Sequence, residues 1–204
     1  EGVGLYPDLL ATLQDVYIAY FDADCGDLRF ARRENEQWRI QILDQGTRST
    51  SDSPEFRTGL FPSLAVDSQG QLAIAYQDQS RGRVLYGSLA QEPYSPEVVD
   101  EGTRIVSTSQ RPKRLIGAFL TLSFHRFDQP VLTYFDATET ALIRALRETN
   151  RASSWQLRTI QSAGATGFFA HHTLLADRFI AVSEKLAFEQ SQFRSQLIWY
   201  VGEL

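Results

Sequence analysis

A short run of apolar and aromatic residues that ends in a tyrosine and an acidic residue recurs three times along the chain. Val16–Asp22 reads VYIAYFD, Leu72–Asp78 reads LAIAYQD, and Val131–Asp136 reads VLTYFD. The tyrosines of successive copies are 56 and 58 residues apart, about the size of one small supersecondary unit. Units of this size bury their apolar faces by stacking on one another, so the repeat constrains the fold more than any other feature.

Each unit contains segments with the composition of short β-strands. In the first unit, Gly4–Leu10 is followed by Val16–Tyr20, Leu28–Ala31 and Trp38–Leu43, and the last two segments alternate apolar and polar residues. Turn-forming residues separate the segments. The pattern predicts four antiparallel strands connected in sequence, a meander.

Meanders that recur at this spacing predict an all-β fold, a β-propeller of four-stranded antiparallel blades. We expect a single domain over residues 1–204 with about four blades, near residues 4–44, 59–100, 117–160 and 164–204, the last of them one strand short. Two arrangements stay open: a closed four-bladed ring, or an incomplete part of a larger propeller that other sequence or a partner chain completes. An unsealed sheet edge invites pairing, which favours some form of completion.

Bulk composition narrows the class of protein. The chain is 43% hydrophobic and 22% charged, as in ordinary soluble globular proteins, and it has no apolar run long enough to span a membrane. The net charge of −5 argues against a nucleic-acid partner. A start at Glu1 and the absence of Met indicate a processed product, and the single Cys25 rules out an internal disulfide framework.

The repeats resemble those of a known group of proteins. Gly-Leu-Phe-Pro-Ser-Leu-Ala at residues 59–65, followed by Ile-Ala-Tyr-Gln-Asp at 74–78, is similar to the repeats of bacterial secreted and cell-surface β-propellers, and distantly similar to lectin and Asp-box propellers. The resemblance covers residues 4–160 and implies binding of protein or glycan outside the cytoplasm: extracellular, at the cell surface or in the periplasm. The turn at 67–70 lacks the Trp of a true Asp-box, so no site residue is carried over.

Recurrence separates residues that serve the blade from residues that are free to serve a ligand. The tyrosines and aspartates that close the recurring run stand at the same place in three units, so we interpret them as packing residues and as turn acceptors. They are Tyr20, Asp22, Tyr76, Asp78, Tyr134 and Asp136.

No arrangement of residues predicts a cofactor, a metal or a catalytic group. The stretch from Asp22 to Asp27 imitates a calcium-binding loop, but Arg33 stands where an EF-hand needs its twelfth, acidic ligand. His171 and His172 are neighbours on a predicted strand and point to opposite faces, so they do not share a metal. No Gly-rich phosphate loop or nucleophile elbow is present.

The candidate contact residues lie on two matching loops. Thr47 and Arg48 follow the first unit, and Thr103 and Arg104 follow the second, each pair within an Asp-x-Gly-Thr-Arg sequence. Loops on a rigid scaffold often carry binding residues. The alternative is that the sequence forms a turn whose Arg clamps the next blade.

Together these features predict a non-catalytic β-propeller module that binds protein or glycan, as a subunit or fragment of a larger extracellular or envelope assembly. The alternative is a divergent enzyme of the sialidase or glycosidase type. We expect no enzyme, because a six-bladed sialidase ring needs a longer chain and the Arg-Ile-Pro opening of that family is missing. A deep pocket with converging carboxylates would favour the enzyme, and shallow pockets between blades would favour a lectin.

Overall fold

The computed structural model describes residues 2–46, 56–102, 115–148, 154–162, 164–175, 178–189 and 192–203. Every regular element within these ranges is a β-strand, and among the described residues there is no helix long and apolar enough to cross a membrane. The strands form four antiparallel sheets, in each of which the spatial order follows the chain order. We call these sheets blades 1 to 4.

Blades 1 and 2 are four-stranded meanders. Blade 1 consists of β1 (Val3–Ala11), β2 (Val16–Asp22), β3 (Asp27–Glu34) and β4 (Gln37–Asp44). Blade 2 consists of β5 (Thr58–Val66), β6 (Leu72–Asp78), β7 (Arg83–Ser88) and β8 (Glu97–Asp100).

Blade 3 is also four-stranded, whereas blade 4 has three strands within the described residues. Blade 3 consists of β9 (Ile116–Phe124), β10 (Pro130–Asp136), β11 (Ala141–Arg147) and β12 (Trp155–Gln161). Blade 4 consists of β13 (Ala165–Leu175), β14 (Arg178–Glu189) and β15 (Gln192–Glu203).

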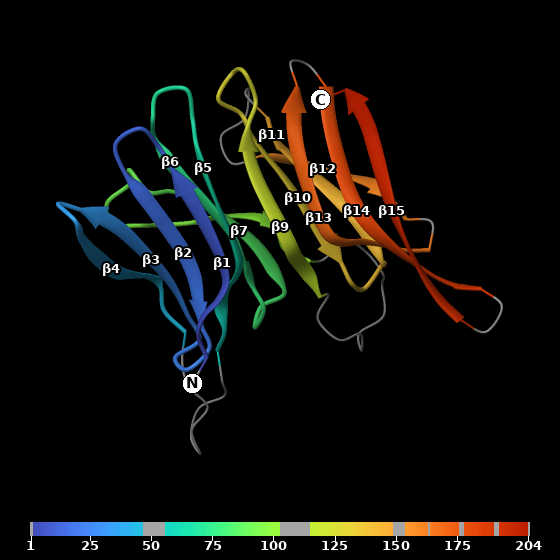
Figure 1. Cartoon of the computed structure of the whole chain (residues 1–204), viewed down its shortest axis with the longest axis horizontal. Helices are drawn as coiled ribbons and strands as arrows, with labels where there is room; N and C mark the ends of the chain where they lie inside the picture. Colours follow the sequence, from blue (N-terminus) through green and yellow to red (C-terminus); the bar gives the residue numbers. More distant parts are fainter. Residues whose placement is uncertain are drawn as a thin grey trace.

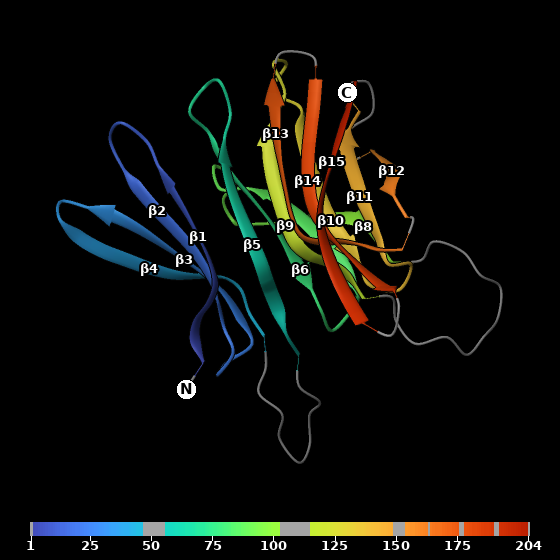
Figure 2. The ribbon, with the colours of Figure 1, turned by 45° about the vertical axis from the view of Figure 1, so that its right-hand side comes forward.

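The blades are arranged as an open arc. The innermost strands β1, β5, β9 and β13 contact one another in that order. Blade 1 lies at the left end in both views (Figures 1 and 2), and blade 4 lies at the opposite end in Figure 1. The predicted all-β propeller of about four blades is therefore confirmed. Of the two arrangements left open, the described residues do not form the closed four-bladed ring, and the open arc fits a partial propeller.

The hydrophobic core lies between blades. Three clusters of buried residues fill the interfaces of blade 1 with 2, blade 2 with 3, and blade 3 with 4. Strand β10 is buried on both faces because blade 3 has a neighbour on either side. Strand β2 alternates buried and half-buried residues because blade 1 is covered on one face only.

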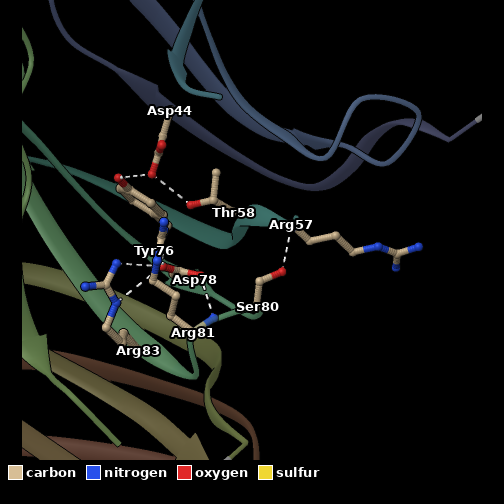
Figure 3. A network of polar contacts seen from close by, with 8 residues as sticks. All are labelled: Asp44, Arg57, Thr58, Tyr76, Asp78, Ser80, Arg81 and Arg83. Carbon is tan, nitrogen blue, oxygen red and sulfur yellow. Dashed lines mark hydrogen bonds and ion pairs between the residues drawn. The ribbon is translucent and has the colours of Figure 1, made fainter. Parts of the chain in front are cut away.

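The recurring aspartates hold the turns that follow the second strands. The Oδ1 atom of each accepts a backbone N–H from two or three residues further on, at 3.0 Å for Asp22, 2.9 Å for Asp78 and 3.0 Å for Asp136. Around Asp78, the guanidinium groups of Arg81 and Arg83 also contact Oδ2, as Figure 3 shows. The prediction that these residues are turn acceptors is confirmed.

The recurring tyrosines tie neighbouring blades together. The hydroxyl of Tyr76 in blade 2 donates to Oδ2 of Asp44, the last residue of blade 1, at 2.9 Å (Figure 3). The hydroxyl of Tyr134 in blade 3 donates in the same way to Asp100, the last residue of blade 2, at 2.5 Å. We call this contact the Tyr–Asp tie. Burial, with smaller effects of Tyr94 and Asp44, raises the pKa of Tyr76 far above its usual range, so its hydroxyl remains a donor.

At the interface of blades 3 and 4 the tie is made by different residues. Gln161 is the last residue of β12, a position at which blades 1 and 2 have aspartate. Ser183 in β14 is at the position that tyrosine occupies in the second strands of the other blades. The Ser183 hydroxyl donates to Oε1 of Gln161 at 3.5 Å. Both members of the pair change together, so the polar link between blades is kept.

Candidate functional site

The innermost strands share a backbone feature that marks the axis side of the arc as the candidate site. Each strand has a glycine in the left-handed region of φ, followed two residues later by an aromatic residue that is also left-handed. The glycines are Gly4 (φ 87°), Gly59 (92°), Gly117 (94°) and Gly167 (105°). The aromatic residues are Tyr6 (φ 51°), Phe61 (48°), Phe119 (53°) and Phe169 (51°).

The strand register shifts at these same positions in all four blades, which makes each pair of residues a β-bulge. The bulges bring the four rings side by side across the inner strands. Ring centroids are 4.1 Å apart for Tyr6 and Phe61, 5.3 Å for Phe61 and Phe119, and 4.6 Å for Phe119 and Phe169. We call these four side chains the aromatic row.

The aromatic row is partly open to solvent. Tyr6 is 45% exposed and Phe169 68% exposed, while Phe61 and Phe119 are half-buried. A left-handed conformation costs a non-glycine residue about 1–2 kcal/mol, and such strain tends to cluster at functional sites. Four strained aromatic residues on one inner surface therefore point to a binding role for that surface.

A second row, of polar residues, lies two positions further along each inner strand. It consists of Asp8, Ser63, Thr121 and His171. Oδ2 of Asp8 accepts the backbone N–H of Leu64 at 2.6 Å, and Oγ of Ser63 accepts that of Leu122 at 3.0 Å. Thr121 donates to the carbonyl of Ala170 at 3.3 Å. Each of these contacts links one inner strand to the next.

The two adjacent histidines point to opposite faces, as predicted. His171 is exposed at the end of the polar row, whereas His172 is buried between Ser123 and Thr133, with 2.6 Å from Nε2 to Oγ and 2.8 Å from Nδ1 to Oγ1. Burial, and to a smaller extent His171, lowers the pKa of His172 to about 3. His172 is a neutral structural residue of the interface between blades 3 and 4.

Glycoside hydrolysis normally needs two carboxyl groups, about 5–5.5 Å apart in retaining enzymes and about 6.5–9.5 Å apart in inverting ones. On the inner strands, within the described residues, Asp8 is the one carboxylate. The described inner strands therefore present one of the two carboxyl groups.

Two shallow clefts lie between the outer strands of neighbouring blades. The cleft between blades 1 and 2 has a volume of about 450 Å³ and is lined by charged side chains, among them Arg32, Glu34 and Arg39. The cleft between blades 2 and 3 has a volume of about 350 Å³ and is lined in part by Glu97 and Arg147. Shallow pockets between blades are the feature expected of a lectin.

The acidic turn of blade 1 brings Asp22, Cys25 and Asp27 within 4.8 Å of one another. Their carboxylates already have partners. Asp22 lies 2.8 Å from the guanidinium of Arg29, and Asp27 accepts the backbone N–H of Gly46 at 2.9 Å. These contacts hold the turn and place a cationic guanidinium beside its carboxylates, so we assign the turn a structural role.

The four predicted contact residues, Thr47, Arg48, Thr103 and Arg104, lie outside the described residues, so that hypothesis stays a prediction. The aromatic row was missed by sequence reasoning. Its signal was present, because an aromatic residue follows a glycine at the same offset in all four units. Residues that recur in every unit are interpreted as packing residues. A binding surface built from one residue of each blade recurs in the same way, so this interpretation hides it.

Comparison of the sequence with models of protein families found no match, and neither did comparison with curated proteins. The structure resembles GH43 glycosidases, which are five-bladed propellers. An exo-β-1,3-galactanase from Clostridium thermocellum has a TM-score of 0.57 at 8% identity, over 96% of this chain and 48% of that one. A GH43 β-1,3-galactosidase with galactodeoxynojirimycin has a TM-score of 0.56 at 8% identity, over 98% of this chain and 76% of that one.

An α-L-arabinofuranosidase, also from Clostridium thermocellum, has a TM-score of 0.53 at 10% identity, over 96% of this chain and 67% of that one. At such identities the likeness shows the fold alone. The chain spans 25% to 48% of the length of four of the GH43 proteins it resembles.

These neighbours correct two expectations. A non-catalytic binding module was expected, and an enzyme was not, but the solved structures that share the fold are glycosidases and favour the alternative of a glycosidase-like propeller. The error has a structural reason. The chain is too short for a six-bladed sialidase ring, but its four blades match part of a five-bladed ring.

Proposed function

We propose that the chain forms four blades of a glycosidase-like propeller whose sugar substrate lies against the inner strands. The observation that carries the proposal is the aromatic row, which crosses the inner surface of a fold shared with galactanases and an arabinofuranosidase. Sugar rings have an apolar face of C–H groups, which packs favourably on exposed aromatic rings.

Asp8 is the residue of the described inner strands that suits an acid–base or nucleophilic role. Its Oδ2 is oriented by the backbone N–H of Leu64, and it lies two residues from Tyr6 of the aromatic row. The second carboxyl group that the reaction requires would come from outside the described inner strands. An extracellular, cell-surface or periplasmic location is part of the proposal, because polymeric glycans are too large to enter a cell unaided.

Calorimetric titration with β-1,3-galactotriose and an arabino-oligosaccharide tests the proposal. We expect Tyr6→Ala and Phe169→Ala each to weaken binding about tenfold, equivalent to about 1.4 kcal/mol, which is within the range of one aromatic contact. Phe127→Ala is the matched control, because Phe127 is 65% exposed but lies in the turn between β9 and β10. Equal effects of all three substitutions, or no binding of either sugar, would contradict the proposal.

Turnover gives a second readout. Release of sugar from aryl β-galactosides and aryl α-L-arabinofuranosides should be lost in Asp8→Asn, with sugar binding retained. Hydrolysis that survives Asp8→Asn would remove Asp8 from the proposed chemistry.

A further inference from the structure

The outward face of blade 1, which no other blade covers, is the strongest unexplained surface of the molecule. It is formed by side chains that share one side of the sheet through strand pairing. They are Leu9, Ile18, Tyr20, Trp38, Ile40 and Ile42, and we call them the free face. Leu9 is 62% exposed and Ile40 57% exposed, which is unusual for a contiguous apolar surface.

We propose that the free face binds a further β-blade, and that the outermost strand of that blade presents a side-chain oxygen, most simply of an aspartate, to the hydroxyl of Tyr20. This inference does not depend on the proposed sugar binding.

Residues at matching positions of the next two blades form the established interfaces. In blade 2, Leu64, Ile74 and Tyr76 are buried against blade 1, together with Tyr94 and Val98. In blade 3, the matching residues that pack against blade 2 are Leu122, Leu132, Tyr134, Trp155 and Leu157. The free face repeats this composition, with Trp38 and Ile40 in place of Trp155 and Leu157. It has the chemistry of a blade interface without the neighbouring blade.

Tyr20 adds a polar requirement to this apolar surface. Tyr76 and Tyr134 at the same position are fully buried, and each donates to an aspartate at the end of the preceding blade. Tyr20 is half-buried, and within the described ranges its hydroxyl has no hydrogen-bond partner. A blade that packs on the free face would supply this acceptor.

Blade 4 of the same chain does not meet this requirement. It lies at the opposite end of the arc, and its described strands end at β15, the third in order (Figure 1). In blades 1 and 2 the acceptor of the tie is the last residue of the fourth strand. Blade 4 of a second copy lacks a described fourth strand in the same way. A further blade with four strands is therefore the occupant that fits.

The test adds a fifth blade of known sequence. In this fusion, a copy of residues 58–116, which contains blade 2, is placed directly before Gly4. In the natural chain the same segment ends directly before Gly117, the glycine that matches Gly4, so the spacing between the two blades is kept. The copied Asp100 then lies where Tyr20 needs an acceptor, and the copied surface is the one that holds Trp155 in the natural interface.

We expect this fusion to melt at a higher temperature than the parent chain. Tyr20→Phe should lower the melting temperature of the fusion by about 2–4 °C and leave that of the parent unchanged. A fusion whose copied Asp100 is replaced by Ala is the matched control, and in it Tyr20→Phe should have no effect. Equal shifts in parent, fusion and control would overturn the proposal.

A second measurement does not depend on the folding of the fusion. Tetranitromethane should nitrate Tyr20 of the native 204-residue chain and spare Tyr76 and Tyr134, as read by peptide mass spectrometry. Protection of Tyr20 in a monomer would show that the chain covers its own free face. Protection that disappears on dilution of a dimer would show that a second copy covers it. Either result overturns the proposal of a further blade.

Discussion

At the scale of single residues, two kinds of position carry most of the information: aromatic residues held in a left-handed backbone, and polar residues that connect blades. Both kinds of residue recur once per blade, so substitutions at matching positions of different blades can be compared. These positions differ mainly in the residues around them. This comparison gives three tests at the residue scale, one for the tie, one for the strained backbone and one for the buried histidine.

The Tyr–Asp tie should contribute to stability only where both of its members are present. Tyr134→Phe removes a buried donor and leaves Asp100 without it, so we expect the free energy of unfolding to fall by about 1–3 kcal/mol. Tyr20→Phe, which removes no hydrogen bond within the described residues, should change it by less than about 0.5 kcal/mol. Urea denaturation of both variants measures the difference, and equal losses would show that the tie is not the cause.

The strained backbone of the aromatic row can be tested at its most exposed member. Glycine in a strand is usually less stable than alanine by about 0.5–1 kcal/mol. At Phe169, where φ is 51°, we expect the reverse: Phe169→Gly should be more stable than Phe169→Ala by about 1 kcal/mol. Chemical denaturation gives the sign directly, and the usual order would mean that the position is not left-handed.

The buried histidine should make stability depend on pH. His172 has a folded-state pKa of about 3, whereas an unfolded histidine has a pKa near 6.5. Between these values the unfolded state binds the additional proton, so stability falls as the pH decreases from about 6.5 towards 3, by up to about 1.4 kcal/mol per pH unit. Unfolding measured at pH 7 and pH 4.5 should show a smaller pH effect in His172→Gln than in wild type.

His125→Gln is the control for this pH dependence, because His125 is only half-buried and lies in the turn after β9. A pH dependence that is the same in wild type and His172→Gln, or that His125→Gln removes instead, would contradict the assignment.

At the scale of elements, the bulge of the inner strand lets successive blades approach closely. A Cβ atom on Gly59 would lie 2.4 Å from Cβ of Leu28 in blade 1, a distance that side chains do not tolerate. The glycine of this repeat therefore has two functions. It adopts the left-handed conformation, and it leaves room for the neighbouring blade.

The two functions separate in a pair of matched variants. Gly4 has a similar φ to Gly59, but nothing lies within 4 Å of a Cβ atom there, because none of the described blades packs against this side of blade 1. Gly4→Ala should cost about 1 kcal/mol from backbone strain alone. Gly59→Ala should cost more than about 3 kcal/mol, since the interface has to shift as well. Comparable losses in urea denaturation would mean that close approach is unimportant.

The strands themselves were largely predictable from the sequence. Alternating apolar residues indicate strands, and a fixed repeat length indicates units that stack on one another. A sheet that is covered on both faces needs apolar residues in every strand. The segment around Val131 shows this well, being apolar at nearly every position and buried on both faces. The bulges were not predictable in this way, since Gly followed by an aromatic residue fits many turns and strands.

At the scale of the whole molecule, an open arc explains why the sequence suggested the fold better than the function. The number of blades needed to close a ring depends on how neighbouring blades pack, and no single repeat encodes it. The candidate site is also distributed, with one aromatic and one polar residue from each inner strand. Reading each repeat as a structural unit hides such a surface.

The measurement that tests the central claim most directly is an NMR experiment with β-1,3-galactotriose and a chain labelled on its Phe and Tyr rings. We expect intermolecular nuclear Overhauser effects from sugar ring protons to Tyr6, Phe61, Phe119 and Phe169, which would place the sugar on the aromatic row. Contacts to Phe30 or Tyr86, which line the outer clefts, with none to the aromatic row, would contradict the claim that the inner surface is the substrate site.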